Sequence, residues 1–298
     1  MTEQIQKKHR NIFAASIIVL SITVIFLVLG PVTRLYAVDK WSAAVKSLDG
    51  SPIAYGVGGR NQGSEAPALV FIHGWTCNHE LWAAQLEYFS KGHKVIWLDL
   101  ADHGESGSKR DDYTMQAFGR DVVAVVDKTG TDKAILIGHS MGGPVAVEAA
   151  RLLGDKVAGI VAVDIFFTSL GLPDSKDGIV EFLRPFRSDF PSASETFVRS
   201  MFLPEADPER VTSIVEIMSG ADKDMAVSAL GNVTEWLIEN GPSLPGEFAP
   251  KLRAINAVRA ADPVGQAGVV TIPDVGHFIA QVKPDVFNKA LERIISEY

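Results

Sequence analysis

A serine lies between two glycines in the run Gly-His-Ser-Met-Gly, residues 138–142. An apolar, β-branched run precedes it (residues 133–138), and a helical pattern follows it (residues 141–153). A serine held on a tight turn from a strand into a helix projects its hydroxyl above the sheet, and the pattern G-x-S-x-G is typical of a nucleophile. The chemistry would be attack of Ser140 on a carbonyl carbon. The backbone N–H of Met141 opens the helix, and we expect it to stabilise the resulting oxyanion.

A nucleophilic serine needs a general base and a second oxyanion donor, and the sequence offers one residue for each. His277, in the run Asp-Val-Gly-His-Phe, follows the last predicted strand and comes after the serine, the chain order that this type of serine turn requires. Trp75, in His-Gly-Trp, follows a buried apolar run, so its backbone N–H is the expected second donor.

Four motifs in this order carry a resemblance to a known family. They are His73–Gly74, the D-x-x-x-H-G-x-S pattern of residues 99–106, the GHSMGG of residues 138–143, and the GHF of residues 276–278. On these motifs, residues 45–298 resemble the α/β-hydrolase superfamily, in its single-domain esterase and haloperoxidase-like branch. The resemblance implies Ser140 as nucleophile and His277 as general base, and it says little about the substrate.

An acid that orients the histidine has two candidates. Asp262 follows the predicted strand at 252–258, and the resemblance implies this as the commonest place for the acid. The next strand follows after only about nine residues, however, and a connection between parallel strands usually needs ten to twelve. Asp164 ends the apolar run 157–164, a place where the resemblance implies that some relatives carry the acid. A carboxylate at the end of a buried strand needs a hydrogen-bond partner, and an imidazole is a suitable one. We prefer Asp164 and keep Asp262 as the alternative.

The elements around these residues predict an α/β-hydrolase fold, with a mostly parallel eight-stranded sheet flanked by helices. From about Trp41 onward, short β-branched runs alternate with helical patterns, as in a mainly parallel sheet. Two strands are expected within residues 43–59, and the others at 68–74, 94–100, 133–138, 157–164, 252–258 and 268–272. Helices are expected near 80–90, 114–128, 141–153 and 284–297. The hydrolase domain would span residues 41–298.

A long segment separates the sixth and seventh predicted strands. It has about 85 residues, far more than such connections usually need, and we place the insert at about 165–250. Seven phenylalanines lie between Phe166 and Phe202, and several prolines divide the segment into short pieces. This composition predicts a helical lid with its own small core, whose apolar underside lines a substrate pocket.

The N-terminus has a different composition from the rest of the chain. Residues 1–10 contain Lys7, Lys8 and Arg10, and the run that follows is free of charge as far as Gly30. Its length suits a transmembrane signal anchor, which we place at residues 11–33, with residues 1–10 in the cytoplasm and the hydrolase domain on the periplasmic or extracellular side. The alternative is a cleaved signal peptide, which would make the protein secreted.

Charge and composition exclude several classes of protein. The net charge of −8, with no basic cluster beyond the N-terminus, argues against a nucleic-acid partner. A single cysteine, Cys77, excludes an intramolecular disulfide, and no residue cluster has metal-ligand spacing, so neither a metal nor a cofactor is expected. We interpret His73 and His139 as structural members of their motifs, because the resemblance implies one base near the C-terminus. His103 lies in a predicted turn, and we interpret it as structural too.

The expected activity is that of a carboxylesterase-like or lipase-like serine hydrolase that cleaves an ester or thioester of an apolar small molecule or lipid through an acyl-enzyme on Ser140. The same residues could also perform acyl transfer, perhydrolysis or carbon–carbon bond hydrolysis. A membrane-tethered binding protein that kept the fold without catalysis is the alternative from another class. The sequence does not determine the oligomeric state.

Overall fold

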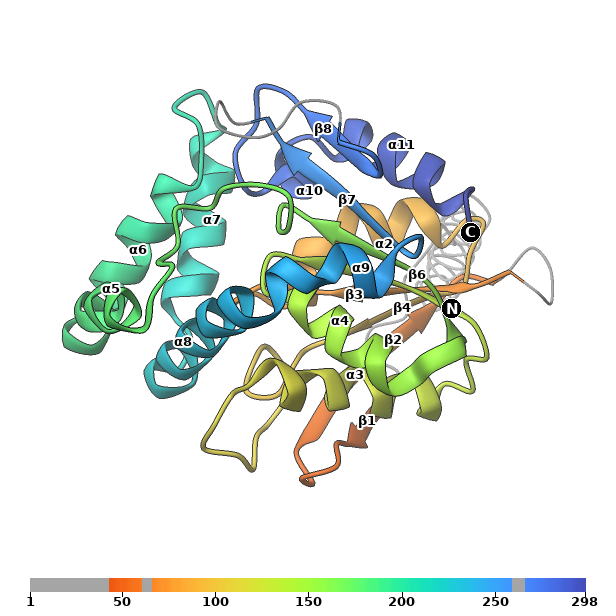
Figure 1. The fold of residues 1–298 in the computed structure, drawn as a ribbon, viewed down its shortest axis with the longest axis horizontal. Coiled ribbons are helices and arrows are strands. Elements are labelled where there is room, and N and C mark those ends of the chain that lie inside the picture. Colours follow the sequence, from red (N-terminus) through yellow and green to blue (C-terminus); the bar gives the residue numbers. More distant parts are fainter. Residues whose placement is uncertain (1–42, 61–65, 259–265) are drawn as a thin grey trace, which may run out of the picture. The chain divides into compact units, whose positions relative to one another are not determined.

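An eight-stranded sheet forms the centre of the computed structural model, which describes residues 43–60, 66–258 and 266–298 (Figure 1). Its strand order is β1-β2-β4-β3-β5-β6-β7-β8. β2 runs antiparallel to both β1 and β4, and all the other neighbours are parallel, which confirms the predicted, mostly parallel sheet. The strands are β1 (Ala43–Lys46), β2 (Pro52–Gly58), β3 (Ala68–Ile72), β4 (Val95–Leu98), β5 (Ala134–His139), β6 (Val157–Val163), β7 (Leu252–Ala257) and β8 (Val269–Ile272).

Helices cover both faces of the sheet, so the central strands are apolar throughout. In β3, Val70 and Ile72 belong to one core cluster, whereas Leu69 and Phe71 belong to the other, because successive side chains of a strand point to opposite faces. The first cluster packs on α3 (Met115–Lys128) and α4 (Gly142–Leu153). The second packs on α2 (Ala83–Phe89), α10 (Ile279–Val282) and α11 (Pro284–Ile295). Short 3₁₀ turns, η1 (His79–Trp82) and η2 (Gly154–Lys156), precede α2 and β6.

The sheet brings three predicted site segments to one edge. β3, β5 and β6 are adjacent and parallel, with Ile72 opposite Gly138 and His139 opposite Val163. The loops that follow these strands therefore start side by side, and they carry Trp75, Ser140 and Asp164. β7 and β8 extend the sheet beyond β6, so the loop after β8, which carries His277, starts at the same edge.

The long segment between β6 and β7 is helical. Its elements are α5 (Lys176–Ser188), α6 (Phe190–Ser200), α7 (Pro208–Ser219), α8 (Lys223–Asn240), η3 (Gly241–Ser243) and α9 (Leu244–Phe248), and we call residues 165–250 the helical insert. Pro191 and Pro208 lie in the first turns of α6 and α7, where the missing N–H costs no hydrogen bond. Asp189 and Asp207 cap the same two helices. These two prolines therefore divide the insert by starting helices, whereas Pro185 lies inside α5 and does not divide it.

The predicted transmembrane segment, residues 11–33, lies outside the described residues. Within the described ranges, none of the helices has the length and apolar character needed to cross a bilayer.

Candidate active site

Ser140 occupies the turn between β5 and α4 in a left-handed backbone conformation, with φ of 52°. Its backbone N–H donates to Val163 O at 2.9 Å, and its carbonyl accepts from Gly143 N at 2.8 Å. A residue other than glycine in this conformation costs on the order of 1–3 kcal/mol. The two hydrogen bonds, together with the flanking strand and helix, hold the serine in place.

The two flanking glycines are required by close backbone contacts. A Cβ atom on Gly138 would lie 2.1 Å from Gly142 O, and a Cβ atom on Gly142 would lie 2.5 Å from Ile72 O. Both distances are far below van der Waals contact. Glycine at 138 thus lets the strand pass close to the start of α4, and glycine at 142 lets that helix start close to the end of β3, which is the physical reason for the G-x-S-x-G spacing.

Asp164 and His277 form a buried pair. His277 Nδ1 and Asp164 Oδ2 are 2.6 Å apart, and the two residues are 6% and 0% exposed. The other carboxylate oxygen, Oδ1, accepts from Ala257 N at 2.8 Å. An ionised carboxylate can only accept, so Nδ1 carries the proton and donates it, which leaves Nε2 free to accept a proton. Asp262, the alternative acid, lies outside the described residues.

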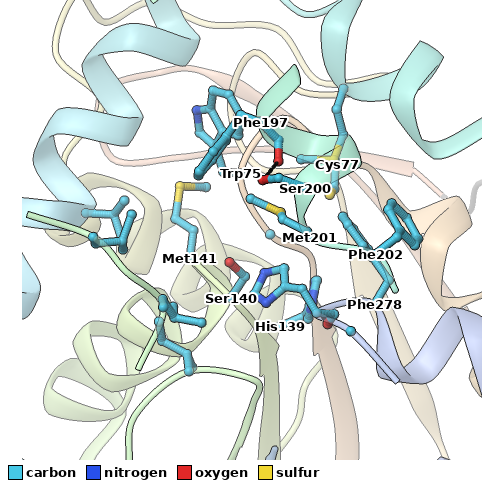
Figure 2. Close-up of a pocket in the computed structure, with 18 of the residues that line it drawn as sticks. Trp75, Cys77, His139, Ser140, Met141, Phe197, Ser200, Met201, Phe202 and Phe278 are labelled. Carbon is cyan, nitrogen blue, oxygen red and sulfur yellow. Dashed lines mark hydrogen bonds between the residues drawn. The ribbon is translucent and has the colours of Figure 1, made fainter. Parts of the chain in front are cut away.

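Ser140 and His277 line one cavity of about 270 Å³ (Figure 2). In the described part of the chain, no hydrogen bond joins the Ser140 hydroxyl to His277, or to any other group. Hydrogen bonds of this kind are often long until a substrate binds. The structure thus brings Ser140 and His277 to the same cavity, and Asp164 contacts His277 from outside the cavity lining.

Trp75 and Met141, the predicted oxyanion donors, also line this cavity. Neither of their backbone N–H groups has a hydrogen-bond partner among the residues that the structure describes. Met141 directly precedes α4, so its N–H lies at the positive end of that helix. Both groups are therefore available to a ligand oxygen.

The comparisons with known proteins concern the fold of the chain. Residues 67–210 match the family described as the alpha/beta hydrolase fold. The structure of a thermophilic esterase from Thermogutta terrifontis superposes with a TM-score of 0.73, covering 87% of this chain and 98% of the esterase at 22% identity.

The chain has the α/β-hydrolase fold.

Two sequence relatives are also similar to this α/β-hydrolase-fold chain. The bifunctional esterase/perhydrolase of Acinetobacter calcoaceticus is 39% identical over 33% of this chain and 37% of its own length. A Haemophilus influenzae protein, whose name assigns it provisionally to the esterases and lipases, is 23% identical over 78% of this chain and 84% of its own length. The chain spans little more than a third of the Acinetobacter enzyme that it matches.

Three further histidines of this α/β-hydrolase-fold chain are buried. His73 Nε2 accepts from Leu100 N at 3.0 Å, and its Nδ1 donates to Gly74 O at 2.8 Å, so the ring is neutral and ties the loop after β3 to the loop after β4. Burial lowers the pKa of His73, and it lowers the pKa values of His103 and His139 to about 3. His139 Nε2 donates to the backbone oxygen of His277 at 3.1 Å.

The helical insert holds the loops that carry Trp75 and His277. The Trp75 indole N–H donates to Ala226 O of α8 at 2.7 Å, and its ring contacts phenylalanines of α5 and α6 edge-on. The backbone N–H of His277 donates to Met201 O at 2.9 Å, and the rings of Phe202 and Phe278 stack at 4.7 Å.

No pattern in the sequence indicates these contacts. The phenylalanine-rich composition predicted that the insert would line a pocket. It did not indicate which of its residues reach the catalytic loops, because that depends on how the helices pack.

Proposed function

We propose that this protein is a serine hydrolase that cleaves an ester or thioester of an uncharged, apolar small molecule or lipid. The observation that carries the proposal is the buried Asp164–His277 pair, whose histidine lines the same cavity as a serine held on a strained turn. Hydrolase activity also agrees with the esterase names of the relatives.

The proposed mechanism uses five groups. Ser140 Oγ attacks the carbonyl carbon of the substrate while His277 Nε2 takes the hydroxyl proton. The Asp164 carboxylate stabilises the imidazolium that forms. The N–H groups of Trp75 and Met141 donate to the oxyanion of the tetrahedral intermediate. His277 then returns the proton to the departing alcohol or thiol, and a water molecule hydrolyses the acyl-enzyme by the same steps.

The polarity of the cavity favours an uncharged substrate. Among the described residues that line it, none is Lys, Arg, Asp or Glu. Most of the lining is aliphatic, aromatic or methionine, and the three methionines, Met141, Met201 and Met218, suit ligands of variable shape. A substrate with a carboxylate or phosphate near the scissile bond would find no cationic side chain there, so we infer an apolar acyl or alcohol group.

The test uses an alkyl fluorophosphonate probe, which reacts only with an activated serine. We expect covalent labelling of the full-length chain and its loss in Ser140→Ala. Ester hydrolysis should fall by at least about 10³-fold in that variant, as for other serine triads. The melting temperature should stay within about 2 °C, because the hydroxyl has no partner in the described structure.

Ser200→Ala is the matched control, because Ser200 lines the same cavity. It should keep the labelling. If Ser140→Ala is labelled as strongly as the wild type, the nucleophile lies elsewhere. If the wild type is not labelled at all, the fold serves binding and the proposed activity is wrong.

For localisation, we propose that residues 11–33 anchor the hydrolase domain on the outer side of a membrane. The support is the uncharged run of the sequence and the basic residues that precede it.

A further inference from the structure

A groove on the helical insert lies between α5 and α6. Its volume is about 550 Å³. Its apolar lining residues are Phe182, Pro185, Phe186, Ala193 and Phe197, and its polar ones are Ser188, Asp189, Ser192, Thr196 and Ser200. None of these residues has been given a role in the proposed mechanism.

The groove and the catalytic cavity share two lining residues, Phe197 and Ser200. Figure 2 shows both residues on α6, across the cavity from Ser140. The ring of Phe197 is only half-buried and contacts Trp75 edge-on at 6.0 Å on the cavity side and Phe182 at 5.5 Å on the groove side. Phe197 therefore lies between the two spaces, beside Phe186, which lines the groove and contacts Trp75.

The chemistry of the groove suits an alkyl chain. Its floor is formed by aromatic rings and aliphatic carbons, and its polar residues are mostly hydroxyl-bearing. The one charged lining residue is the acidic Asp189, so nothing among the described lining residues would attract an anion. The catalytic cavity is small for a ligand of lipid size, since ligand sites commonly reach several hundred Å³. A long acyl chain attached to Ser140 needs additional apolar space, and the adjoining groove provides it.

We propose that the groove between α5 and α6 is the outer part of an acyl-chain site, which a medium-length or long acyl chain reaches by passing Phe197. This inference rests on the proposed function, and it narrows the substrate class to acyl esters with chains that outgrow the catalytic cavity. Each methylene that enters the groove should raise affinity by roughly two- to fourfold, the value for partial to full burial of a CH₂ group.

The first test measures chain-length preference. For the full-length protein, kcat/KM is measured on p-nitrophenyl butyrate and p-nitrophenyl decanoate. Thr196→Trp places a large ring in the groove from an exposed helix position, and it should lower the decanoate-to-butyrate ratio by about 10-fold. Phe197→Ala removes the ring that both spaces share and should raise that ratio.

Arg199→Trp is the matched control. It introduces the same ring on the same helix, at an exposed residue that lines neither space, so the ratio and the butyrate activity should both stay unchanged. If Thr196→Trp and Arg199→Trp show the same chain-length profile as the wild type, the groove does not hold the acyl chain.

A second test needs no turnover, so it separates this inference from the proposed function. Methyl octanoate and methyl butyrate are titrated calorimetrically into Ser140→Ala. Octanoate should bind more tightly by at least about 10-fold, and adding Thr196→Trp should remove most of that difference. Equal affinity for the two esters would overturn the inference. If octanoate is preferred but the wild type hydrolyses neither ester, the acyl site stands and the proposed hydrolysis fails.

Discussion

Asp164 accepts hydrogen bonds on both carboxylate oxygens, one from His277 and one from Ala257. Asp164→Asn should therefore lower kcat for ester hydrolysis by on the order of 10⁴, because an amide stabilises the wrong imidazole tautomer, as in serine proteases. Asp262→Asn is the comparison variant and should change kcat by less than about threefold. The measurement is kcat for p-nitrophenyl butyrate. A damaging Asp262→Asn with a mild Asp164→Asn would assign the acid to the other position.

The buried histidines make stability depend on pH. An unfolded histidine has a pKa near 6.5, whereas burial lowers that of His103 to about 3. Between these pH values the unfolded chain binds one more proton at His103 than the folded chain. The contribution of this ring to stability is therefore complete above pH 6.5 and is lost as the pH falls toward 3. In urea titrations between pH 6 and 4.5, His103→Gln should reduce the slope of unfolding free energy against pH by about 1.4 kcal/mol per pH unit. Equal slopes for variant and wild type would show that this ring does not stay neutral.

At this scale the sequence predicted the residues that local constraints determine. The placement of Ser140 on a strand-to-helix turn was predictable because its glycines, its strand and its helix are adjacent in the chain, and that of His277 because it follows the last strand. The acid was not determined, because Asp164 and Asp262 both follow strands and the choice depends on how the loops fold around the imidazole. The hydrogen bond of Met201 O with the His277 loop joins distant parts of the chain, and no local pattern indicates it.

Among the elements, the strands were the most predictable. Runs such as residues 68–72 are buried on both faces, so their continuous apolar composition is required by the sheet. The insert was predictable as helical and apolar. The sequence did not predict which of its helices contact Trp75 or which of them form the groove. Aromatic side chains can pack in several arrangements of similar energy.

The junction between the insert and the loop after β8 offers a test at the scale of elements. A Cβ atom on Gly276 would lie 2.1 Å from Met201 O, so Gly276→Ala must push the insert away from His277. We expect kcat to fall by at least about 10-fold and the melting temperature to fall by several degrees. Gly246→Ala is the matched control in α9, where an added Cβ atom meets nothing within 4 Å, and it should change neither quantity appreciably. Equal behaviour of the two variants would mean that the junction does not position the histidine.

For the whole molecule, residues 38–298 form a compact unit by themselves. Deleting residues 1–37 should therefore leave kcat/KM on short soluble esters within about twofold and move the protein from the membrane fraction to the soluble fraction.

In cells with the full chain, protease added from outside should digest the hydrolase domain before lysis. If the domain is protected until lysis, the proposed orientation is wrong. If the full-length chain is found in the soluble fraction, the proposed anchor is wrong.

The contacts of the insert with the loops of Trp75 and His277 also affect how the chain can be engineered or diversified. An insert of this kind is an attractive module to exchange between related enzymes when a new specificity is wanted. Here Ala226 O holds the loop of a proposed oxyanion donor, and Met201 O holds the loop of the proposed base. A transplanted insert would lose catalysis along with the old specificity unless it preserved both carbonyl contacts, or was exchanged together with residues 75–77 and 276–278. The insert that would set specificity therefore also positions the loops of the proposed oxyanion donor and base.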